Sequence, residues 1–189
     1  MSPDSSAEEY QSREERAEIS LRYRERRGRE LRELASQGIG VPAEAIEAAG
    51  EFSSVPTEAI AAIPGLGMLM LPLARRRARK AGIGPKLMLA LDAEKLHALD
   101  LKPADMRRDR NQASGVDSWP RRECSVKRGG RVFMRDRVFL TVPGREEPIT
   151  LYAPPLITNP WSSEVVRQLG GEAPDPLDLS ASGPANDAP

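Results

Sequence analysis

The fold of this chain is decided by the sequence LMLALDAEKLHALDL, which occupies residues 87–101. Two segments rich in apolar residues, 87–91 and 95–101, lie on either side of a polar triplet, DAE at 92–94. This arrangement predicts two short β-strands joined by a turn, although the leucines would also fit one side of a helix. Because residues 87–91 are apolar at every position, we expect a central strand that is buried on both faces.

The residues after this hairpin predict further strands of an antiparallel sheet. After a polar connector at 103–118, polar and apolar side chains alternate over 119–127, as they do in a half-exposed strand. The sequence RGG at 128–130 is typical of a turn. The longest strand signal follows at 131–142, and the last strand is expected at 148–152.

Helices are expected on both sides of this sheet. Residues 10–35 are dense in Glu and Arg and contain no Pro, which predicts a helix that is charged on every side. Gly38 and Gly40 would end this helix, and a second short helix is expected from 41 to 49. The next residues, 51–56, are expected to be a loop or a short edge strand.

The helix signal at the C-terminal end is stronger. Asn159 can cap a helix that has Pro160 in its first turn, and Trp161, Val165 and Leu169 recur every four residues, so they would face the sheet. The expected organisation is a charged helical region at 10–50, a linker at 51–85, a β domain with its closing helix at 86–171, and disordered ends at 1–9 and 172–189.

The composition limits the classes of protein to which the chain can belong. One cysteine, Cys124, excludes an intramolecular disulfide and fits a reducing compartment. The polar, acidic first residues do not have the basic start and apolar core of a secretory signal. We therefore expect a cytoplasmic protein, either free or attached to the inner face of the membrane.

The net charge of zero conceals a strong separation of charge along the chain. Residues 75–137 carry 18 Lys and Arg against 8 Asp and Glu, whereas residues 1–74 carry 8 against 13 and residues 138–189 carry 2 against 7. A basic centre between acidic ends suggests either an anionic partner or acidic ends that fold back on the centre.

Two basic segments are candidate binding sites. Residues 60–74 carry no charge and are followed by a basic cluster of Arg75, Arg76, Arg77, Arg79 and Lys80. This pattern is typical of an interfacial anchor for an anionic membrane. The alternative is an apolar linker that packs on the sheet. The longest expected strand has arginines and phenylalanines on one face: Arg131, Phe133, Arg135, Arg137 and Phe139. Such a face can stack the bases and hold the phosphates of a nucleic acid. The alternative is a partly exposed sheet face on which arginine side chains cover the aromatic rings. The RDR triplet within it would form a bulge or a turn.

The sequence contains no recognisable catalytic or metal-binding pattern. His97 is the only histidine, so we expect it to be a half-buried strand side chain and not a metal ligand. Cys124 is expected to be a small apolar residue, since a nucleophilic thiol needs an activating base. We therefore expect no enzyme activity, no metal, no cofactor and no membrane-spanning segment.

The order of strands and the closing helix resemble a pleckstrin-homology-like (GRAM-like) domain over residues 45–171. LALDAEKLHALDL resembles the first hairpin of bacterial members, WPRRECSV their Trp–Arg strand, VFLTVPGREEPITLY the following strand–turn–strand unit and 159–169 their closing helix. AAGEFSS and residues 60–74 are similar to the N-terminal half of actinobacterial proteins of this type. The resemblance implies a small bent antiparallel sheet, or partial barrel, in an α+β protein.

The resemblance also implies a binding or scaffolding module without catalytic residues. Lipid-binding members usually carry basic residues in the first hairpin turn, whereas this turn, 92–94, is acidic. An anion site would then lie at 75–80 or at Arg131, Arg135 and Arg137. The expected function is binding of a protein or an anionic membrane surface; the alternatives are nucleic-acid binding through 131–139 and assembly into a larger complex through the N-terminal helix.

Overall fold

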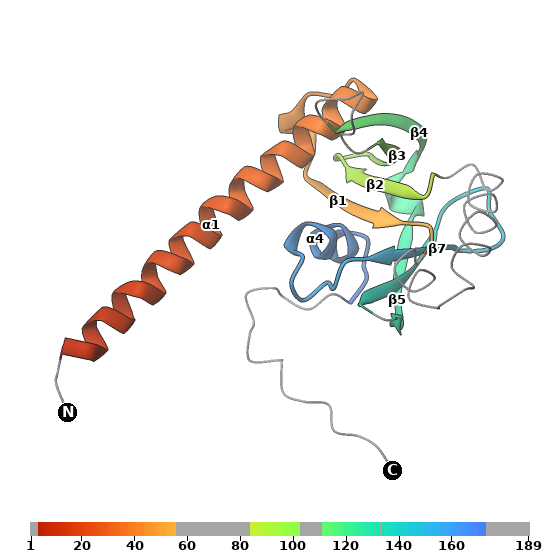
Figure 1. The fold of residues 1–189 in the computed structure, drawn as a ribbon. Helices are drawn as coiled ribbons and strands as arrows, with labels where there is room; N and C mark the ends of the chain where they lie inside the picture. The colour runs from red at the N-terminus through yellow and green to blue at the C-terminus, as the bar shows by residue number, and fades with distance from the viewer. Residues whose placement is uncertain (1–3, 56–83, 103–110, 133, 173–189) are drawn as a thin grey trace, which may run out of the picture.

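A computed structural model describes residues 4–55, 84–102, 111–132 and 134–172, and the side chains from residue 18 onward within these ranges. Within these ranges the protein is α+β, with an antiparallel sheet of seven strands and two α-helices (Figure 1). The helices are α1 (Asp4–Ile39) and α4 (Pro160–Gln168). The strands are β1 (Ala48–Ser53), β2 (Lys86–Leu91), β3 (Lys95–Lys102), β4 (Gln112–Pro120), β5 (Ser125–Val132), β6 (Arg135–Thr141) and β7 (Ile149–Ala153).

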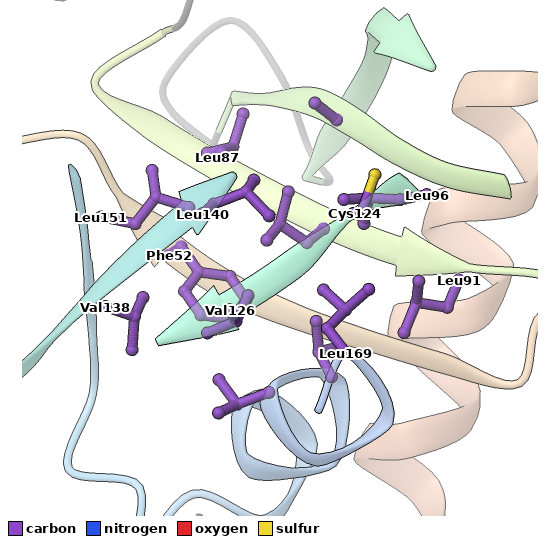
Figure 2. Packing of buried hydrophobic residues seen from close by; sticks show 14 of the residues in the cluster. Phe52, Leu87, Leu91, Leu96, Cys124, Val126, Val138, Leu140, Leu151 and Leu169 are labelled. Atoms are coloured by element: carbon purple, nitrogen blue, oxygen red, sulfur yellow. The ribbon is translucent and has the colours of Figure 1, made fainter. Parts of the chain in front are cut away.

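The sheet consists of two antiparallel meanders that meet at its centre. The strand order is β4-β3-β2-β1-β7-β6-β5, so β1 to β4 form one meander and β5 to β7 form the other. β1 and β7 are joined in the described sheet through the residue pair Ser53 and Tyr152. This narrow junction lets the two meanders bend toward each other, and Figure 2 shows Phe52 and Leu87 of the first close to Leu140 and Leu151 of the second.

The bend encloses one apolar core, which α4 covers. Leu89 and Leu91 of β2 belong to the same buried cluster as Val138 of β6 and Val165 of α4. Helix α4 begins as predicted, because the side chain of Asn159 accepts a hydrogen bond from the Ser162 amide at 2.9 Å.

The C-terminal part of α1 covers the outer face of the first meander. Leu31 and Ala35 are buried there against Met88, Ala90 and Leu99. A small residue brings the end of the helix close to the sheet: a Cβ added to Gly38 would lie 3.1 Å from the Ala113 carbonyl oxygen. One face of β2 therefore lies in the core that α4 covers, and the other face packs against α1. This confirms the prediction of a central strand buried on both sides.

The position of β1 is the largest correction to the predicted fold. Residues 41–49 were expected to be a helix and 51–56 a loop or edge strand, but only a short 3-10 helix is present (Ala43–Ala45), and β1 is a central strand. The sheet therefore begins well before the predicted boundary at residue 86. The physical reason is the approach of α4: a Cβ added to Gly50 would lie 2.8 Å from the Ser162 Cα, so β1 needs small residues that do not look like a strand.

Three other segments differ from the prediction. The expected connector at 103–118 contains most of β4, and the expected strand at 119–127 is divided by a 3-10 helix, Arg121–Glu123, between β4 and β5. The expected turn at 128–130 is an irregularity within β5. The 131–142 segment is divided, as predicted, but β6 already begins at Arg135.

The ends of the helices also differ from the predicted boundaries. Helix α1 begins at Asp4 and continues to Ile39, so it includes part of the segment 1–9 that was expected to be disordered. Gly40 follows with φ of 75°, which confirms that glycine ends the helix. None of the helices in the described ranges is long and apolar enough to cross a membrane.

Candidate functional site

The single histidine joins the first hairpin to β4. His97 is buried and lies 2.8 Å from the Ser118 hydroxyl through Nδ1 and 2.9 Å from the Asp92 carboxylate through Nε2. Asp92 also accepts hydrogen bonds from the amides of Glu94 and Lys95 through its other oxygen. His97 thus lies deeper than the half-buried position predicted for it.

The hydrogen bonds of Asp92 determine its protonation. Burial raises the pKa of this carboxyl, but the hydrogen bonds from His97 and the two turn amides outweigh burial and hold the pKa below its ordinary value of 3.8. The carboxylate is therefore charged at neutral pH and fixes both the turn and the histidine ring. The sequence suggested the polar turn but gave no sign of Ser118, which lies far along the chain in the expected connector.

A cleft of roughly 870 Å³ opens beside this network. It lies between the end of α1, the 3-10 helix at Ala43–Ala45, the 92–94 turn and β4, and its lining includes carboxylates from Glu44, Glu47, Asp92, Glu94 and Asp117. Glu47 forms an ion pair with Arg121 at 2.6 Å. No cluster of three or more metal-ligating side chains occurs among the described residues.

Cys124 is held in the structure as a thiol. It is buried, and its Sγ donates to the Pro120 carbonyl oxygen at 3.4 Å. Burial, assisted by the nearby Glu123 carboxylate, raises the pKa of Cys124 to about 11. A thiol with this pKa is almost entirely protonated at neutral pH, which agrees with the predicted role of a small apolar residue.

The basic strand face is occupied in part by its own contacts. The Arg137 guanidinium lies 5.1 Å from the centroid of the Phe139 ring, and a Cβ added to Gly129 would be 2.8 Å from that ring. Arg131 contacts the buried Asp136 at 3.4 Å. Phe139 is half-buried and Arg135 is also partly buried, whereas Phe133 lies outside the described residues. Binding of nucleic acid by this face stays a prediction.

The proposed membrane segment also lies outside the described residues. This applies to the apolar stretch 60–74 and to Arg75, Arg76, Arg77, Arg79 and Lys80. Salt-sensitive co-sedimentation with vesicles containing phosphatidylserine would test the prediction that these residues bind an anionic surface.

Helix α1 presents apolar side chains beyond the point where it contacts the sheet. Ile19, Leu21 and Tyr23 are 68%, 55% and 52% exposed. Figure 1 shows that the N-terminal part of α1 extends away from the sheet and the other helix. Ile19 and Tyr23 are four positions apart and share one side of the helix, whereas Leu21 lies on the opposite side. Exposed apolar side chains on an element that extends from the rest of the molecule are typical of an interaction surface. The sequence indicated a charged helix but not which part of it would remain uncovered.

A junction between the two helices marks where the extension begins. Trp161 of α4 donates a hydrogen bond from its indole nitrogen to the Arg24 carbonyl oxygen at 3.3 Å and packs edge-on against Tyr23. Arg27 forms an ion pair with Glu51 of β1 at 2.6 Å. Trp161 was expected to face the sheet, but it packs against α1 because Gly28 leaves space for its ring.

No protein-family model, curated protein or solved structure matches this chain. The candidate site therefore depends on geometry alone: the extended part of α1, with Ile19, Leu21 and Tyr23, is the described surface with the clearest need for a partner.

Proposed function

We propose that this protein is a non-enzymatic, PH-like binding and scaffolding module that contacts a partner protein through the extended part of α1. The observation that carries this proposal is the exposure of Ile19, Leu21 and Tyr23 on a helix of 36 residues that the sheet supports only at its C-terminal end. The sheet together with α4, which we term the body, holds the helix, and the helix presents the binding surface.

The PH-like part of the proposal is supported by the topology. A four-stranded meander and a three-stranded meander share one core, and an amphipathic helix follows the last strand and packs against that core. This arrangement agrees with the bent sheet and closing helix that the sequence resemblance implies.

The physical chemistry of α1 explains why a partner is needed. A polar helix that buries no side is marginally stable in water, because propensity and side-chain pairs contribute only tenths of a kcal/mol each, about 0.2–0.5. The extended part has such a pair in Arg22 and Glu18, 2.6 Å apart and both exposed. Contact with another protein along the side of Ile19 would bury this side chain and stabilise the helix.

The contacts of the reactive side chains support a role in binding over a role in catalysis. His97 bridges Asp92 and Ser118, the Cys124 thiol is buried, and the Asp136 carboxylate binds two arginines and the Leu156 amide. Each of these groups holds together elements of the body.

Photo-crosslinking tests the proposal in the full chain. A photoreactive residue at position 19 or 21 should give a discrete crosslinked protein product in the host cell, whereas the same residue at position 134 should not. Met134 is a matched control, because it is 75% exposed and lies on the body. The proposal would be overturned by the absence of products from 19 and 21, or by the same products from 134.

A further inference from the structure

The two halves of α1 carry opposite charge. Residues 4–18 contain six Asp and Glu against two Arg, and residues 22–33 contain six Arg against three Glu. Ile19 and Leu21 lie between these halves, near the middle of the helix. A helix of this kind is complementary to a copy of itself that runs in the opposite direction.

The charges are also arranged along one side of the helix. Helix positions that follow one another at intervals of three or four share a side, and one such series, which we term the charged stripe, is Asp4, Glu8, Gln11, Glu15, Glu18, Arg22, Arg26, Arg29 and Glu33. The stripe changes from acidic to basic between positions 18 and 22. Its arginines are exposed: the side chains of Arg22 and Arg26 are 75% and 71% exposed and pair with Glu18 and Glu30 on the same helix, and Arg29 is also exposed.

The stripe lies on the side of α1 that the body leaves open. The residues of α1 that pack closely on the body include Gly28, Leu31, Ala35 and Gly38, which form a second series at intervals of three or four. On a helix with 3.6 residues per turn, this series falls roughly opposite the charged stripe. A second helix can therefore lie along the stripe without displacing the body of either copy.

We infer that the partner of α1 is the α1 helix of a second copy of this chain, paired antiparallel along the charged stripe. This inference rests on the proposed function, because it specifies the partner that the extended helix binds. A two-fold axis between positions 18 and 19 brings position 15 of one copy opposite Arg22 of the other, and position 8 opposite Arg29. Position 11 then faces Arg26, and Ile19 lies beside the axis, opposite position 18 of the other copy.

Charge directs this pairing. Opposite charges face each other where position 8 meets 29 and where position 15 meets 22, and the two-fold symmetry makes each of these pairs occur twice. The end positions 4 and 33 are both acidic and contribute nothing favourable. Because the paired charges remain near solvent, ions screen them over roughly 10 Å at 0.1 M salt. The dimer should therefore form at low salt and dissociate as salt is added.

The first experiment measures the mass of the full chain in solution at several concentrations and at low and high salt. We expect twice the 20.7 kDa of one chain at low salt and high concentration, with a shift to the single mass at high salt. A wild-type chain that has the single mass under all these conditions would overturn the inference.

Two charge variants test the antiparallel arrangement. Arg22→Glu with Arg29→Glu makes the stripe predominantly acidic and leaves Arg26 as its one basic residue, and Glu8→Arg with Glu15→Arg makes it predominantly basic. Each variant alone should be monomeric under conditions where the wild type is dimeric, and an equimolar mixture of the two should restore a dimer that contains one copy of each. Circular dichroism checks that helix content is retained.

The matched control changes the same number of charges on the body. Arg122→Glu with Lys127→Glu alters exposed residues away from α1 and should leave the wild-type dimer unchanged. If the two stripe variants dimerise as the wild type does, or if their mixture stays monomeric, the inference is wrong.

A failure of the inferred pairing with a second copy can be distinguished from a failure of the proposed function. A wild-type monomer whose position 19 crosslinks to a different protein would retain the proposed function and remove only the second copy as the partner. A monomer without any crosslinked product would remove both.

Discussion

The two halves of α1 have the same backbone structure but different relations to the rest of the molecule. The C-terminal half lies on the sheet through Leu31 and Ala35, which are 1% and 0% exposed. The N-terminal half extends beyond the sheet and exposes Ile19 and Leu21. The comparison teaches that helix formation and helix docking have different determinants. A sequence rich in Glu and Arg suffices to form the helix, whereas docking on the sheet depends on a few small and apolar residues.

The strongest test of this difference is to shorten one leucine in each half. Leu31→Ala should lower the free energy of unfolding by about 2–5 kcal/mol, because it leaves a cavity against the sheet. Leu21→Ala should change it by less than about 0.5 kcal/mol at a concentration where the chain is monomeric. Urea denaturation measures both variants. Equal effects would contradict the division of α1 into docked and extended halves.

A bulky residue at the end of the docked half should have the next largest effect. Gly38→Val would place methyl groups against Leu99 and the Ala113 carbonyl oxygen, since a Cβ here already lies 2.5 Å from the Leu99 side chain. We expect a loss of about 1–3 kcal/mol from overpacking. The control is Gln37→Val on the neighbouring exposed position, which should cost about 0.5 kcal/mol through helix propensity alone.

The cleft beside the end of α1 offers a test by pH. Asp92→Ala should cost about 1–2 kcal/mol at neutral pH, since the carboxylate accepts hydrogen bonds from His97 and the turn amides. The pKa of Asp92 in the folded protein is below 3.8, so the unfolded chain binds the proton more readily than the folded protein does. The contribution of the Asp92 carboxylate to the free energy of unfolding is therefore fully present above about pH 4.

As the pH falls through the folded pKa of Asp92, the difference between wild type and variant should therefore shrink. Denaturation midpoints measured from pH 7 down to about pH 3 follow this change. Glu94→Ala, in the same turn but exposed, serves as the control. If the difference in stability between the wild type and Asp92→Ala stays constant over this pH range, the charge of Asp92 does not stabilise the turn.

The smallest expected effect concerns ion pairs on the two halves. Arg27→Ala removes the ion pair with Glu51 and should cost up to about 1 kcal/mol, because both side chains are partly covered. Arg22→Ala removes an exposed pair with Glu18 and should cost about 0.3–0.5 kcal/mol. A larger effect for Arg22 in the monomer would mean that the extended half has support from the body.

The parts of the fold that were predictable have a local signal. The 87–101 hairpin combines apolar strands with the Asp92 turn, and α4 has its cap at Asn159 and its apolar repeat at Val165 and Leu169. Both were expected at nearly their observed positions. The α+β class and the two terminal helices followed from these local patterns.

The parts that were missed depend on contacts between distant segments. β1 contains Gly50 because α4 passes close to it, and nothing within the segment indicates this contact. β4 is polar because it is an edge strand, so its sequence looks like a loop. The link from His97 to Ser118 and the docking of Trp161 on α1 are likewise visible only in the folded structure.

The contact between Trp161 and Arg24 also has a consequence for synthesis of the chain. The two residues are 137 positions apart, so at about 5–20 residues per second the ribosome needs roughly 7–27 s to make the second after the first. Helix α1 is therefore made before the strands that it covers, and its contact with α4 forms only after α4 has been made. During this interval Leu31 has no sheet to cover it, and the nascent helix presents an apolar surface that a chaperone can bind.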